Sequence, residues 1–209
     1  MRNIIFALLV SMLLVMAVAC ENETVGDATI ESDENGFLIT PEDLRVAVNQ
    51  AASQEWQLPE YEVNEIPDHS RQSTSYITPS LMFVVNEYFG EGGGMPVIII
   101  QYRDPEKELS EEDLALMTEC FEIVVGLVDP KEDAQEIMDV VMGDETIYES
   151  DNLFYIYDSH TTEYFGHFAT FMIAVSADPW IETYYHDRDL IIQSEEEWGG
   201  NGATTETSN

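Results

Sequence analysis

Basic residues are scarce in this chain. Seven Lys and Arg stand against 42 Asp and Glu among 209 residues, which gives a formal net charge of -35. Nucleic-acid recognition requires clustered Lys and Arg side chains that neutralise phosphates. The arginines beyond the N-terminus are instead spread along the sequence, at Arg45, Arg71, Arg103 and Arg188. The composition therefore argues against a nucleic-acid partner.

The chain also lacks the motifs that identify many enzymes and metal proteins. It contains no His-Glu-x-x-His or Cys-x-x-Cys pair, so the strong zinc signatures are missing. No Gly-x-Ser-x-Gly elbow occurs. The glycine-rich stretch at 90–94 lacks the Lys-Ser/Thr of a phosphate loop and precedes an expected strand, where a dinucleotide site needs a helix. We assign no catalytic residue and predict a non-enzymatic protein.

The first twenty residues have the layout of an export signal. Arg2 supplies a positive start, and residues 4–18 are apolar apart from Ser11. The run ends in small residues that lead into Cys20, and acidic, polar chain follows at once. This arrangement is typical of a secretory signal peptide, and the run is shorter than the roughly 20 residues of a spanning helix. A retained membrane anchor is the rival interpretation.

The cysteine at the end of this run resembles that of bacterial lipoprotein signals, which are cut before a cysteine after its thiol is acylated. The resemblance covers residues 1–20 and departs from the class at Ala17, where Leu is usual. It implies removal of residues 1–19, lipidation of Cys20 and attachment to a membrane through that lipid. The protein is then expected outside the cytoplasm or at the cell surface of a bacterium.

The acidic composition has two interpretations. Self-repulsion between carboxylates is screened at high ionic strength, where the Debye length falls to about 3 Å at 1 M salt, so the charge suits a saline exterior. Alternatively, the surface binds divalent cations such as Ca²⁺ or Mg²⁺, or a basic partner. The most ligand-like short run is His186, Asp187 and Asp189, whose imidazole and carboxylates could hold a metal ion, although a solvated acidic turn explains the same run.

The chain divides into a leader, a tether, a domain and a tail. Residues 20–39 are polar and acidic and are expected to form a linker that begins at the lipidated Cys20. Residues 40–193 are expected to form a single domain, because apolar residues make up 44% of the chain, too many for a disordered acidic protein. Residues 194–209 consist mainly of Glu, Gly, Thr and Asn. This composition predicts a disordered tail.

Within the domain, helices and strands alternate in blocks. Thr40-Pro41 and Ser110 predict helix starts, and Asp129-Pro130 predicts the start of a third helix that ends at Gly143. Strands are predicted near 61–66, 81–89, 95–102, 153–157 and 164–175, the second and third as a hairpin and the last as central, with 158–162 as a connecting turn. This order indicates an α+β fold, an antiparallel sheet of about four to six strands with about three helices packed on one face.

Aromatic residues gather after the last long strand. Trp180, Tyr184 and Tyr185 lie within six residues, and exposed Trp and Tyr are enriched at recognition surfaces. These side chains could bind an envelope protein or a neutral glycan, but they could equally close one end of the core.

Taken together, these features predict a membrane-tethered, exported binding module of the cell envelope. A divalent-cation-binding or salt-adapted surface protein is one alternative. An envelope hydrolase is the other, and it requires the fold to bring His160, His167 or His186 against a carboxylate and a hydroxyl in one cleft.

Overall fold

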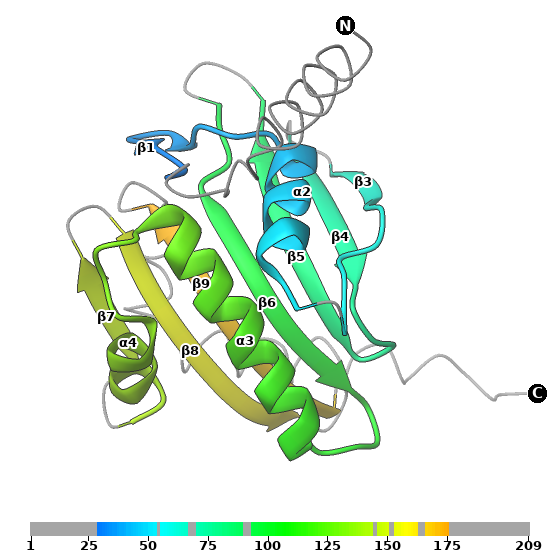
Figure 1. The fold of residues 1–209 in the computed structure, drawn as a ribbon. Coiled ribbons are helices and arrows are strands. Elements are labelled where there is room, and N and C mark those ends of the chain that lie inside the picture. Colours follow the sequence, from blue (N-terminus) through cyan, green and yellow to red (C-terminus); the bar gives the residue numbers. More distant parts are fainter. Residues whose placement is uncertain are drawn as a thin grey trace, which may run out of the picture.

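A seven-stranded antiparallel sheet dominates the computed structural model of the chain (Figure 1). The structure describes residues 29–53, 55–66, 70–89, 93–143, 146–150, 153–162 and 166–175. The strands are β1 (Ser32–Asp33), β2 (Gly36–Phe37), β3 (Glu62–Ile66), β4 (Ser70–Tyr76), β5 (Leu81–Tyr88), β6 (Val97–Asp104), β7 (Ile147–Ser150), β8 (Leu153–Thr162) and β9 (Gly166–Val175). The helices are α2 (Pro41–Ala51), α3 (Glu111–Val128) and α4 (Ala134–Val141). The α+β prediction is confirmed.

The strand order in the large sheet is β3-β4-β5-β6-β9-β8-β7. The predicted hairpin of β5 and β6 forms, with Phe83 opposite Ile100. The chain then passes through α3, α4, β7 and β8 before β9 returns to pair with β6, placing Phe171 opposite Ile100. The strand predicted to be central, β9, therefore lies between β6 and β8, as expected from its length and apolar character.

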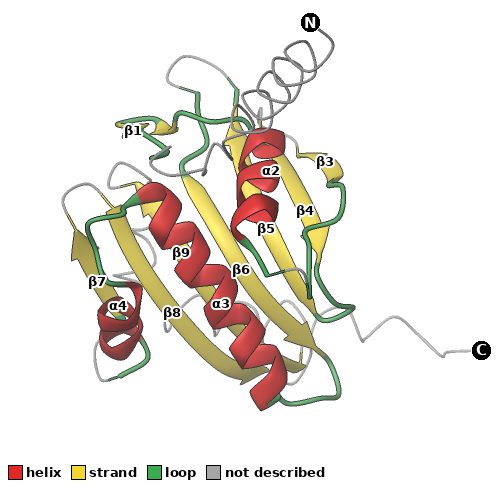
Figure 2. Cartoon of the chain, viewed as in Figure 1, coloured by secondary structure: helices red, strands yellow, loops and turns green. Residues whose placement is uncertain are grey.

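The helices cover one face of this sheet, which we call the front face (Figure 2). Residues of α2, α3 and α4 form one continuous core with the alternate strand residues that point toward them. Phe121 of α3 lies at its centre, stacked on Phe171 with 4.6 Å between ring centroids and edge-on to Tyr155 at 6.1 Å. Cys120, fully buried in the same helix, is a packing residue.

Two of the three predicted helix starts are confirmed. Thr40 and Ser110 cap α2 and α3, and each hydroxyl accepts a hydrogen bond from the backbone N–H three residues later. The third helix forms as α4, but its predicted start is wrong, because Asp133 and not Asp129 caps it and accepts a hydrogen bond from the backbone N–H of Gln135. Asp129 instead points to Ser150 and Tyr155 across the core.

The sheet is larger than the predicted four to six strands. The strand β4 escaped prediction because its sequence, Ser-Arg-Gln-Ser-Thr-Ser-Tyr, has no apolar alternation, although three of its hydroxyl residues are buried. The strand β7 has only four residues, too few to show a period. The expected turn at 158–162 is also wrong, since these residues continue β8 and pair with β9.

Part of the segment expected to be a linker belongs to the folded domain. Ile30 and Phe37 are buried in the core, and the backbone N–H of Ile30 donates to Leu127 O at 2.7 Å. The Phe37 N–H donates to Met95 O at 2.9 Å. Gly36 permits this approach, because a Cβ at its φ of +145° would meet the Met95 backbone at 2.5 Å. The predicted boundaries at residues 19 and 193 lie outside the described residues.

Among the residues that the structure describes, no helix is long and apolar enough to cross a membrane.

The packing of the 29–39 segment yields a first prediction. Phe37→Ala should destabilise the domain by about 3–5 kcal/mol, because it leaves a cavity in the core. Leu38→Ala, which truncates the exposed neighbour, should change the free energy of unfolding by less than about 0.5 kcal/mol. Urea denaturation of the two variants compares them directly. If both substitutions changed the free energy of unfolding by an equally small amount, residues 29–39 would be part of the linker and not of the folded domain.

Candidate functional site

A recess opens on the front face between the start of α2 and the strands β3 and β4. It has a volume of about 430 Å³. Three parts of the chain form its lining, namely the first turn of α2, the approach to β3, and the front-facing residues of β3 and β4. The lining residues are Thr40, Pro41, Glu42, Glu60, Tyr61, Val63, Arg71 and Ser73.

The guanidinium of Arg71 is held firmly at this recess. Its Nε and Nη2 atoms donate to the two carboxylate oxygens of Glu87 on β5, at 2.7 and 3.0 Å. This bidentate pairing raises the pKa of Arg71. The Phe89 ring lies against the same group, with 5.0 Å from the guanidinium carbon to the ring centroid. Arg71 therefore presents a fixed cation whose charge is largely neutralised by Glu87.

Tyr61 contributes a neutral phenol to the recess. Burial raises its pKa, so the hydroxyl stays protonated at physiological pH. No residue in the described part of the chain forms a hydrogen bond with this hydroxyl. With the hydroxyls of Thr40 and Ser73 and the carboxylates of Glu42 and Glu60, the recess offers donors and acceptors to a polar ligand.

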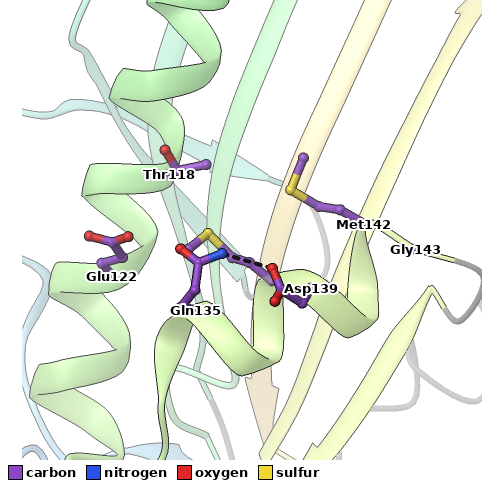
Figure 3. Close-up of a pocket in the computed structure, with 7 residues that line it drawn as sticks. Thr118, Glu122, Gln135, Asp139, Met142 and Gly143 are labelled. Atoms are coloured by element: carbon purple, nitrogen blue, oxygen red, sulfur yellow. Dashed lines mark hydrogen bonds between the residues drawn. The ribbon is translucent and has the colours of Figure 1, made fainter.

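A second, smaller recess of about 360 Å³ lies between α3 and α4 (Figure 3). Its lining includes two carboxylates, from Glu122 and Asp139, and the half-exposed thioether of Met142. Gln135 already donates to Asp139 at 2.8 Å. This recess carries no cationic side chain and no histidine, so it offers less varied chemistry than the recess at Arg71.

A polar cluster links the end of α3 to β7 and β8. The Ser150 hydroxyl lies 2.9 Å from an Asp129 oxygen and 3.0 Å from a Glu132 oxygen. Tyr148 donates to Glu132 at 2.7 Å, and Tyr155 donates to Asp129 at 3.2 Å. The hydrogen bond to Glu132 raises the pKa of Tyr148 to about 12. Three hydroxyls thus satisfy two carboxylates, which explains the cluster as part of the structure.

The two histidines that the structure describes, His160 and His167, lie on opposite faces of the sheet. His160 Nδ1 lies 3.0 Å from Asp158 Oδ2, and both residues face the side of the sheet opposite the helices. His167 Nδ1 lies 3.0 Å from the Thr161 hydroxyl, and this pair faces the front. A hydrolytic triad needs acid, base and hydroxyl in one chain of contacts. Here the carboxylate and the hydroxyl accompany different histidines on opposite faces of the sheet.

The sequence-predicted site residues lie outside the described residues. This holds for the lipidation site Cys20, for the metal candidates His186, Asp187 and Asp189, and for the recognition candidates Trp180, Tyr184 and Tyr185. Within the described ranges, no group of three or more His, Cys, Asp and Glu residues could hold a metal ion.

Sequence analysis missed the recess at Arg71 because it depends on β4. The only signal in the sequence is the Ser-Thr-Ser run at 73–75, which has some β propensity. Comparison of the chain with protein-family models, curated proteins and solved structures finds no match in any of the three.

The polar cluster yields a second prediction. Glu132→Gln should lower the pKa of Tyr148 from about 12 toward the ordinary tyrosine value, because it removes the charge that the phenol faces. NMR of isotope-labelled tyrosine rings during an alkaline titration measures this value.

Glu149→Gln is the matched control, since Glu149 follows Tyr148 but points to the opposite face of β7. The stabilisation associated with Tyr148 is present below the unfolded pKa of about 10 and is lost as pH rises through about 12. The assignment fails if both variants shift the pKa of Tyr148 equally.

Proposed function

We propose that this protein is an exported lipoprotein, tethered to a bacterial membrane through Cys20, whose acidic α+β domain binds an envelope protein or glycan without catalysing a reaction. The observation that carries the proposal is the apolar run of residues 4–18, which ends in small residues before Cys20 and passes at once into acidic chain. Acyl chains on that cysteine would anchor the protein, because each buried CH₂ contributes about 0.8 kcal/mol.

The position of Ile30 supports a short tether. Ile30 is buried in the core, and only the nine residues 21–29 separate it from Cys20. An extended chain from Cys20 to Ile30 spans about 35 Å. The domain would therefore remain close to the membrane surface, where its ligand should also be found.

The chemistry of the recess supports a binding role. Hydroxyls, carboxylates and a neutralised guanidinium line it, and a tyrosine forms part of its wall. Such a surface suits a neutral ligand rich in hydroxyl groups, or a polar segment of a protein.

The lipid anchor yields a third prediction. Cys20→Ser should abolish incorporation of a labelled fatty acid and leave the leader uncut, because the acceptor thiol is missing. Cys120→Ser is the matched control, since Cys120 is fully buried in α3 and burial raises the pKa of its thiol. Labelling that persists in Cys20→Ser, or that is lost in both variants, contradicts the anchor.

Adaptation to salt is the second candidate function, favoured by the formal charge of -35. Carboxylate repulsion weakens as ionic strength rises, so the melting temperature of residues 21–209 should climb smoothly with NaCl. At constant ionic strength, millimolar calcium should then leave the melting temperature unchanged, and so should EDTA. A calcium-dependent rise that EDTA reverses would instead support the divalent-cation alternative, and residues 186–189 would be mutated first.

A further inference from the structure

The face of the sheet opposite the helices, the back face, is apolar across five strands. One row of paired residues runs from β5 through β6, β9 and β8 to β7, as Val84, Ile99, Met172, Ile156 and Ile147. Val97 and Ala174 lie in the adjoining row. Val97 and Ala174 form a second hydrophobic cluster with Ile99, Phe154 and Met172, separate from the core beneath the helices.

The centre of this face is nevertheless buried. Ile156 is 1% exposed, Val84 4% and Val97 5%. Apart from Pro41, which lines the recess at Arg71, the buried residues of α2, α3 and α4 all belong to the front core. An isoleucine on a sheet face with nothing over it keeps part of its side chain in water, so another part of the molecule must cover these residues.

The cover does not extend over the whole face. Tyr76 on β4 and Ile66 on β3 belong to the same face, yet each is 43% exposed. Thr74 on β4 pairs with Val84 on this face and is only 5% exposed, so the change from buried to exposed falls within β4, between Thr74 and Tyr76. A covering segment of limited width, which lies over β4 at Thr74 and over β5, β6, β9 and β8, accounts for this boundary.

We propose that residues 176–193 of this chain pack across the back face. The segment leaves β9 at Val175, at the end of a strand within the covered area. Eighteen residues can extend about 60 Å, whereas the four strand spacings from β4 to β8 measure about 19 Å. Length and starting point both suffice for the segment to cross the face.

The composition of 176–193 matches the surface. Within it stand Trp180, Ile181, Tyr184, Tyr185, Leu190, Ile191 and Ile192. The other long stretches outside the described residues fit less well: residues 21–28 and 194–209 are polar, and residues 1–19 form the predicted leader. In this arrangement Trp180 and the tyrosines complete a second core in place of forming an exposed recognition surface.

Limited proteolysis of the purified chain tests the proposal. Arg188 is the only Lys or Arg after Val175, so trypsin reports on the segment at one position. Docking should make this cleavage at least about tenfold slower than cleavage of a peptide with the sequence of 176–193. Ile156→Glu should release the segment and remove that protection. Ile66→Glu is the matched control, because it places the same charge on the exposed part of the same face.

Fluorescence of Trp180 provides a second measurement that does not require a variant of the back face. In a chain carrying Trp56→Phe and Trp198→Phe, docking should shift Trp180 emission to shorter wavelength and protect it from acrylamide. Rapid cleavage at Arg188 in the folded wild-type chain, or Trp180 as accessible as in the peptide, would overturn the proposal. It would also be overturned if Arg188 were protected only in a dimer seen by light scattering, since a second copy would then be the cover.

Discussion

The pairing of β6 with β9 holds the two halves of this protein together. The chain before α3 builds β3 to β6, and the chain after α4 builds β7 to β9. Only this one ladder joins the two groups of strands into a single sheet. The register that places Ile100 opposite Phe171 also decides which residues face the helices. A slip of one residue would turn the apolar residues of each strand to the wrong side, so both hydrophobic clusters depend on this ladder.

Several of the acidic residues lie where the backbone stabilises negative charge, at the N-termini of helices. The first turns of α2 and α3 carry Glu42, Asp43 and residues 111–113, close to the positive ends of the helix dipoles. No basic residue occupies the last turn of any described helix. Arg45 forms an ion pair with Glu42, and Arg71 forms one with Glu87. These two cations thus serve local pairing, and in the part of the chain that the structure describes Asp158 is the only buried carboxylate.

Local signals in the sequence were sufficient for the helices and the apolar strands. Thr40 and Ser110 are caps whose effect depends only on the next three residues, so they could be predicted without the fold. Asp129 failed as a cap because its side chain bonds to Ser150 and Tyr155, more than twenty residues later. The strand β4 and the recess at Arg71 were missed for the same reason. Their burial depends on β3, β5 and α2, which no local pattern of Ser, Arg and Gln reveals.

The two edges of the sheet determine how copies of this domain behave when they meet. A free edge strand offers unpaired backbone groups to which another sheet can add. At one edge, β3 is exposed along its whole length and carries Glu62 and Glu65, so a second copy would bring like charges together. At the other edge, β7 is only four residues long and provides little backbone to pair. The negative charge of β3 and the short length of β7 therefore both disfavour edge-to-edge pairing between two copies of the domain, and with it the growth of fibres.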